Sequence, residues 1–235
     1  MNAAVETLAR LPGVWRGGEL DRAAPSGIPT GHAVLDGELP GGGWPQGAIT
    51  EILHEGVGLG EVTLLVGALK KIAQEGRAVA WVNPPHLPYA PALSLAGIAL
   101  ESCILIRPLT TEDSLWAAEQ ALRSGACGAV LFWLQGNTDY AWLRRLQMAA
   151  QAGRCLALLY RSMAAATLTT PAHLRLVLSH VDGRLNVRIA KRRGPPLATP
   201  IAIARFHALD RTRIARAAPA DRRARGQPAL ALCHR

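Results

Sequence analysis

Apolar residues in this chain form short continuous runs, separated by longer segments in which they recur every three or four positions. Continuous runs are typical of strands covered on both faces of a sheet, and the recurring pattern is typical of helices with one buried face. The runs predict strands at 48–53, 78–82, 103–106, 129–134 and 155–160, and the periodic segments predict helices at 61–75, 89–99, 111–124 and 138–152. Repeated strand–helix units predict an α/β fold with a mainly parallel sheet flanked by helices.

Two later segments have a different pattern. Residues 174–180 and 184–191 alternate apolar and polar positions, as strands with one exposed face do. Asp182-Gly183 between them is typical of a tight turn. We therefore expect a C-terminal antiparallel hairpin that extends the parallel sheet.

The two ends differ from the core, which we assign to 28–204. Residues 1–27 predict a short amphipathic helix and an arm that carries Trp15 and Arg16. These two residues fit a partner contact, and they fit equally an arm packed onto the core. Residues 205–235 hold eight Arg and two Asp, a net charge of +6, which together with Pro and Gly predicts a basic, flexible tail.

The charge balance bears on the partners. Only 18% of the residues are charged, yet the formal net charge is +9. This favours acidic partners, nucleic acid first, over a basic protein with no nucleic-acid role. The basic residues that could contact DNA or an acidic protein are Lys191, Arg192, Arg193, Arg205, Arg211, Arg213, Arg216, Arg222, Arg223 and Arg225. Phe206 is the only aromatic residue among them, so we expect weak, sequence-independent DNA contact and no stacking groove.

Other functional classes lack their sequence signals. The four cysteines form no C-x-x-C and no Cys/His set with zinc-ligand spacing, which predicts free thiols and no metal site. The sequence shows no signal peptide and no run of eighteen apolar residues. We expect a cytoplasmic protein with no membrane contact, where a basic protein can also associate with the nucleoid.

Residues 51–75 read as a strand, a glycine-rich turn and a helix, which is the frame of a phosphate-binding loop. Such a loop needs G-x-x-x-x-G-K-[ST]. Here Glu55 and Gly60 stand at the glycine positions, Glu61 at the lysine position and Val62 at the hydroxyl position. A carboxylate about 4 Å from a phosphate is repelled by about 4 kcal/mol at an effective dielectric near 20. Either the loop has lost its nucleotide, with Glu61 now at the positive end of its own helix, or the unit never bound phosphate.

The stretch before this loop, residues 28–47 (IPTGHAVLDGELPGGGWPQG), resembles the corresponding segment of RecA-like proteins. The resemblance covers about 28–204 and implies a three-layer RecA-like core. It also implies losses, since Pro85 stands where the family carries its catalytic glutamate and Trp133 where it carries the magnesium-linked aspartate. The resemblance therefore implies no catalytic residues, no cofactor and no enzyme activity.

Among RecA-like families that have lost the nucleotide, the chain resembles the ImuA family. The likeness rests on the VWRG arm, the GGGWP segment, the LHE that leads into the degenerate loop, and the basic KRRGP ending of the hairpin. It implies a non-catalytic adaptor in SOS-induced translesion DNA synthesis. The implied partners are an ImuB-type polymerase relative, an error-prone polymerase III alpha subunit and RecA. The alternative is a likeness to the SulA family, which implies a cell-division inhibitor that binds FtsZ; the basic tail weighs against it.

Overall fold

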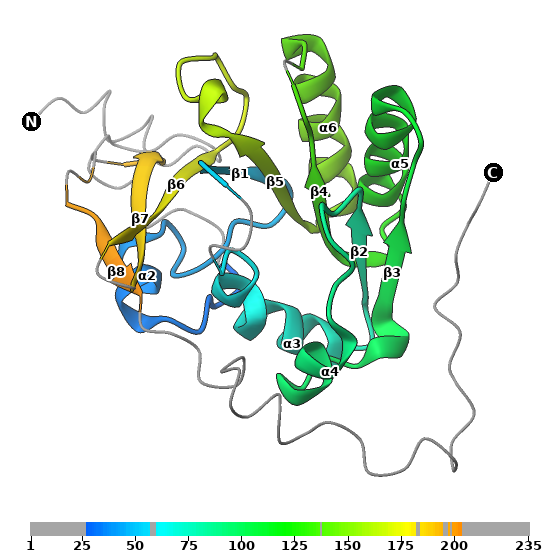
Figure 1. Ribbon diagram of the computed structural model, residues 1–235, viewed down its shortest axis with the longest axis horizontal. Helices are drawn as coiled ribbons and strands as arrows, with labels where there is room; N and C mark the ends of the chain where they lie inside the picture. Colours follow the sequence, from blue (N-terminus) through cyan, green and yellow to red (C-terminus); the bar gives the residue numbers. More distant parts are fainter. Residues whose placement is uncertain are drawn as a thin grey trace, which may run out of the picture.

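The computed structural model describes residues 27–56, 60–136, 138–181, 184–194, 197 and 199–203. They form an eight-stranded sheet in the order β3-β2-β4-β5-β1-β6-β7-β8 (Figure 1). The strands are β1 (Ala48–His54), β2 (Ala78–Val82), β3 (Cys103–Ile106), β4 (Cys127–Trp133), β5 (Leu156–Ser162), β6 (Leu174–Val181), β7 (Arg184–Lys191) and β8 (Ile201–Ile203). The pairs from β3 to β6 are parallel, and β6–β7 and β7–β8 are antiparallel. The mainly parallel sheet with an antiparallel extension is confirmed.

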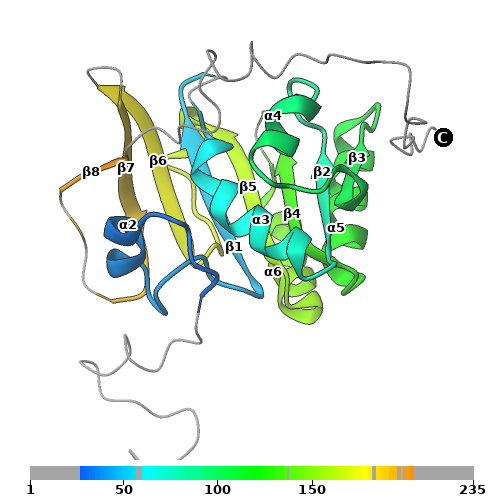
Figure 2. The same cartoon turned by 90° about the horizontal axis from the view of Figure 1, so that it is seen from below.

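Helices cover both faces of the sheet. They are α2 (Ala33–Glu38), α3 (Val66–Gln74), α4 (Ala90–Leu95), α5 (Thr111–Arg123) and α6 (Tyr140–Gly153), with short 3-10 turns at Thr63–Leu65, Leu100–Ser102 and Met163–Ala165. α5 and α6 lie on one face, and α3 and α4 lie on the other, with α2 near β7 and β8 (Figures 1 and 2). Two buried apolar clusters fill the two spaces between helices and sheet. None of the helices in the described part of the chain has the length and apolar composition needed to cross a membrane.

The central strands and the longer helices follow from local sequence. All seven residues of β1 and all seven of β4 are buried, as expected of inner strands in a two-sided parallel sheet. The Thr110 hydroxyl accepts a hydrogen bond from the Asp113 amide at the start of α5, and the Asp139 carboxylate caps α6 in the same way. Gly76, with φ of 71°, ends α3 as predicted.

The helix predicted at 61–75 begins later than expected. The chain turns from Gly60 into a 3-10 segment, and the α-helix starts only at Val66. A tertiary contact accompanies this start, because a Cβ on Gly67 would lie 2.6 Å from the Thr30 carbonyl oxygen. Glu61 therefore lies five residues before the start of α3, and its interaction with the positive end of that helix stays a prediction.

The other helices and strands differ less from their predicted boundaries. The helix predicted at 89–99 is shortened to α4, since Gly97, with φ of 81°, turns the chain away after Ala96. β4 begins two residues earlier than predicted, and β5 ends two residues later. α2 and β8 were not predicted. The predictions for 1–26 and 204–235, including the N-terminal helix, Trp15, Arg16 and the tail, concern segments outside the described residues. The proposed domain limits stay predictions.

Candidate functional site at the carboxyl ends of the parallel strands

The degenerate phosphate loop lies where β1 ends and the chain turns toward α3. Glu55, just past β1, is exposed. Gly60 adopts a φ of 84°, and its carbonyl oxygen accepts hydrogen bonds from the Thr63 amide and the Thr63 hydroxyl. The residue at the lysine position, Glu61, is only 7% exposed, and Val62 is half-buried. The strand–turn–helix frame is thus present, with a buried carboxylate where a phosphate loop has its lysine.

Aromatic side chains from four neighbouring strands, β2, β4, β5 and β1, lie in a row beside this loop. Trp133 is the last residue of β4, and its ring lies 4.5 Å from the ring of Tyr160 on β5, with 5° between the planes. On its other side, Trp133 stacks on Trp81 of β2, with 6.1 Å between centroids and 11° between planes. His54, at the end of β1, meets Tyr160 edge-on at 6.2 Å. We call Trp81, Trp133, Tyr160 and His54 the aromatic row.

The three stacked rings of the aromatic row are buried, and burial keeps the Tyr160 hydroxyl protonated. Trp81, Trp133 and Tyr160 are 2%, 7% and 1% exposed. Burial, with a further contribution from the Glu61 carboxylate, raises the pKa of Tyr160 well above its ordinary value. In open α/β sheets, ligands bind outside the carboxyl ends of the strands. Here the stacked rings belong to a buried apolar cluster and lie at or near those ends, and the nearby charge is a carboxylate that repels phosphate.

The two lost carboxylate positions have different surroundings. Trp133 belongs to the buried aromatic row, where a carboxylate could not be held without replacing the stack. Pro85 is exposed in the loop after β2. That loop is tied down at its start, where the Asn83 amide donates to the Ile106 carbonyl oxygen at 2.8 Å. The described residues contain no group of three or more His, Cys, Asp or Glu side chains placed to hold a metal ion.

A buried ion triad lies on the opposite face of the sheet, on the neighbouring strands β5, β1 and β6. The Glu51 carboxylate on β1 accepts a hydrogen bond from Arg161 Nη1 on β5 at 2.9 Å and from Arg175 Nε on β6 at 2.7 Å. The exposed fractions of the three side chains are 0%, 1% and 8%. Arg175 also donates to the carbonyl oxygens of Ala166 and Leu168. The triad joins β5, β1 and β6 and has a structural role.

The described members of the basic candidate set lie at the end of β7. Lys191 Nζ donates to the Thr170 carbonyl oxygen at 3.0 Å. Arg192 Nη1 forms an ion pair with a Glu38 carboxylate oxygen at 3.0 Å. Arg193 is exposed. Lys191 and Arg192 thus make internal contacts, while Lys191 and Arg193 are both exposed. The remaining candidates, Arg205 to Arg225, lie outside the described residues.

Sequence reasoning found the loop and missed most of the aromatic row. Only Trp133 was singled out, as a lost carboxylate. The signal for the others was present, since the strand runs at 78–82 and 155–160 each carry an aromatic residue at or next to their ends. The predicted free thiols are confirmed for Cys103, Cys127 and Cys155, the cysteines within the described residues.

Comparisons with known proteins point to two related groups. Residues 47–157 match the model of the family described as cell division inhibitor SulA. SulA from Edwardsiella piscicida is 36% identical over 96 residues, which make up 41% of this chain and 56% of that protein. RecA from Bacillus licheniformis is 30% identical over 114 residues, which make up 48% of this chain and 32% of RecA. A crystal structure of SulA from Pseudomonas aeruginosa aligns with 27% identity and a TM-score of 0.40, covering 48% of this chain and 97% of that one.

These similarities cover part of the chain. It spans about half the length of the curated SulA relative and about a third of the RecA relative that it matches. The SulA family match runs from the residue before β1 into β5, so it includes the degenerate loop and most of the aromatic row and stops before β6, β7 and β8. The chain is therefore related to SulA and RecA through its parallel core.

Proposed function

We propose that this protein is a non-catalytic component of the SOS response that acts by binding other proteins. The observation that carries the proposal is the aromatic row, a buried stack at or near the carboxyl ends of the strands, the side of the sheet on which open α/β proteins bind ligands. A site closed by stacked side chains and bordered by Glu61 favours a scaffold over an ATPase.

Its role is that of an adaptor in translesion DNA synthesis. It would link an ImuB-type polymerase relative, an error-prone polymerase III alpha subunit and RecA, with DNA contacts through its basic residues. The support is that β6, β7, β8 and the basic residues from Lys191 onward lie beyond the segment that matches the SulA family, so they are available for contacts outside the SulA-like part of the chain.

A second candidate function is division inhibition through FtsZ. It is favoured by the family match over residues 47–157 and by the 36% identity to a cell division inhibitor. In this alternative the parallel core binds FtsZ, and the strands after β5 complete the sheet.

Affinity capture separates the two candidates. Tagged full-length protein is recovered from cells of the native host before and after DNA damage, and the co-purifying proteins are identified by mass spectrometry. Enrichment of the ImuB-type protein, the alpha subunit or RecA after damage is the expected result. FtsZ recovered with no polymerase component would replace the adaptor by the division inhibitor, and ATP-dependent capture of any partner would count against a nucleotide-free scaffold.

A gain-of-function test addresses the enzyme question directly. The double variant Glu61→Lys/Val62→Thr restores the loop residues but leaves Trp133 in the aromatic row and Pro85 after β2. We expect no ATP turnover above that of the unaltered protein, with RecA as the positive control. Measurable hydrolysis by the double variant would refute the account of the loop.

A further inference from the structure

A pocket lies at the opposite end of the sheet from the aromatic row. Ala48 is the first residue of β1 and Leu174 the first of β6, and both line it. The cavity volume is about 120 Å³. Its remaining lining residues come from the glycine-rich segment, the chain before β6 and the chain after β7: Pro40, Pro45, Gln46, His173, Arg192 and Arg193.

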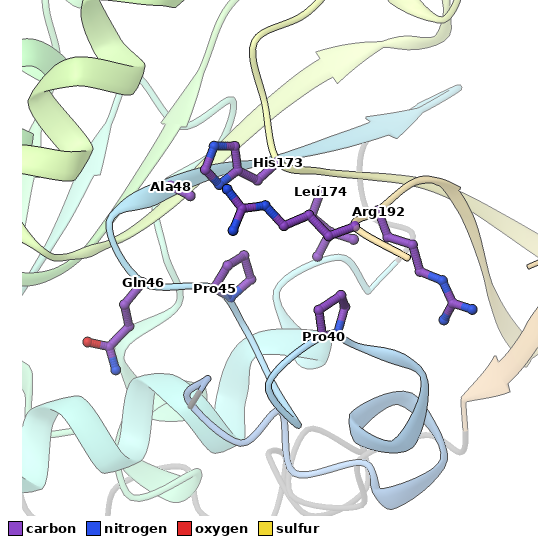
Figure 3. Close-up of a pocket in the computed structure, with 8 residues that line it drawn as sticks. Pro40, Pro45, Gln46, Ala48, His173, Leu174 and Arg192 are labelled. Atoms are coloured by element: carbon purple, nitrogen blue, oxygen red, sulfur yellow. The ribbon is translucent and has the colours of Figure 1, made fainter. Parts of the chain in front are cut away.

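The lining combines an apolar surface with positive charge. In Figure 3 the rings of Pro40 and Pro45 lie across the pocket from His173 and Leu174, and the Gln46 side chain points away. None of the residues that line the pocket is Asp or Glu. Burial lowers the pKa of His173, and the charges of Arg193 and Lys191 near its ring lower it further.

The two cations after β7 differ in their availability. Arg192 is paired with Glu38, the last residue of α2. Arg193 is exposed and makes no ion pair with any described residue. Arg193 is therefore the charge that can meet a ligand without breaking an existing contact.

We propose that this pocket binds an acidic peptide segment of a partner protein. One apolar side chain of that segment enters between Pro45 and Leu174, and a neighbouring carboxylate faces Arg193. The volume suits this, since an engineered apolar cavity of roughly 150 Å³ accepts benzene. Anchors of this kind, one apolar side chain in a pocket with a charged rim, carry much of the affinity in protein interfaces.

Charge argues for a partner other than this chain itself. The tail at 205–235 has a net charge of +6, so Arg193 would repel it. Residues 1–26 carry three acidic and three basic side chains and offer no net attraction. Single-stranded nucleic acid fits less well than a peptide, because it binds by stacking bases on aromatic rings and His173 is the only ring system besides the prolines in the lining.

The inference rests on the proposed function in one respect, that the protein works by binding other proteins. It is independent of whether the partner belongs to translesion synthesis or to cell division. Its test therefore uses a probe that presumes neither.

The probe is a display library of random twelve-residue peptides, selected on the full-length protein. We expect enrichment of sequences with two or more Asp or Glu residues next to a large apolar residue. A fluorescein-labelled synthetic copy of the enriched sequence should bind with a Kd that rises at least tenfold for Arg193→Glu. The matched control is Arg188→Glu, an exposed position on β7, the strand that precedes Arg193; it makes the same change in net charge outside the pocket and should alter Kd less than twofold. Unchanged thermal unfolding of both variants checks the fold.

Several results would overturn the proposal. Enriched peptides without acidic residues, or peptides whose Kd is equally affected by the two substitutions, would mean that the pocket is not their site. A labelled single-stranded oligonucleotide whose binding is lost in Arg193→Glu, while no peptide is, would assign the pocket to nucleic acid. If the peptide result holds but no SOS or division protein is captured from cells, the pocket stands and the proposed function fails.

Discussion

The substitution Glu51→Gln removes the negative charge from the buried triad. The two arginines that depend on it cannot move into water, because their side chains are 1% and 8% exposed. Arg161 loses its ion pair, and its Nε and Nη2 already have no hydrogen-bond partner among the described residues. Arg175 keeps its two bonds to backbone carbonyl oxygens. The main cost therefore falls on Arg161.

The magnitude follows from this burial. Removing one partner of a buried ion pair destabilises a protein by roughly 3–5 kcal/mol. The free energy of unfolding of a typical domain is about 5–15 kcal/mol, so Glu51→Gln should remove a large share of it. The control is Glu119→Gln. The Glu119 side chain is 4% exposed, against 0% for Glu51, but its partners Arg123 and Arg145 are 60% and 53% exposed and can be hydrated, so we expect a loss below about 1 kcal/mol.

Urea unfolding followed by tryptophan fluorescence measures both variants. With a slope of about 2 kcal/mol per M, a loss of about 4 kcal/mol lowers the midpoint by about 2 M, whereas the control shifts it by less than about 0.5 M. Equal shifts in the two variants would refute the reasoning, because they would show that the exposure of the cations does not set the cost. A midpoint for Glu51→Gln within 0.5 M of the unaltered protein (about 1 kcal/mol at that slope) would show that the Glu51 charge contributes little to the stability of the fold.

Three other predictions concern single side chains. Trp133→Ala should lower the free energy of unfolding in urea by about 3–5 kcal/mol, because it removes the middle ring of the aromatic row. The control Trp116→Ala, at a position that is 59% exposed, should lower it by less than about 0.5 kcal/mol. Similar losses in the two variants would contradict the packing role of the aromatic row. In NMR titration, His173 should have a pKa below its ordinary 6.5 that rises in Arg193→Gln. Because the folded state binds this proton more weakly than the unfolded chain, the free energy of unfolding should fall as the pH drops below 6.5; a pKa above 6.5 would reverse that sign. Burial raises the pKa of Cys155 to about 12, so iodoacetamide at pH 8 should label it only in urea, as peptide mass spectrometry can check.

The strands could be predicted because their signal is local. The run at 129–134 is apolar throughout, and only an inner strand or a fully buried helix tolerates that composition, with its length deciding for the strand. The hairpin was equally accessible from its alternation and its Asp-Gly turn. The start of α3 was not, because it coincides with the close approach of Gly67 to Thr30, a contact between segments that the sequence does not show to be neighbours.

The sequence predicts which phosphate-binding residues are missing from the candidate site, but it does not predict the side-chain contacts found there instead. Glu61 at the lysine position can be found by aligning a motif. The stack of Trp133 on Tyr160 requires that β4 and β5 be known neighbours in register, which no periodicity reveals. Glu51 in an apolar strand was likewise a charge without an evident partner until β5 and β6 were placed on either side of it.

The position of β1 between β5 and β6 has a consequence for folding during synthesis. Glu51 meets arginines that follow it by 110 and 124 residues. At roughly 5–20 residues per second, the ribosome needs about 5–25 s to deliver those partners. Throughout that interval β1, whose seven residues are all buried in the folded protein and include Glu51, has neither neighbouring strand. A chain cut at residue 157 would end inside β5, and its β1 would never gain two complete neighbouring strands. The nascent protein is therefore most vulnerable to aggregation and proteolysis before β6 emerges.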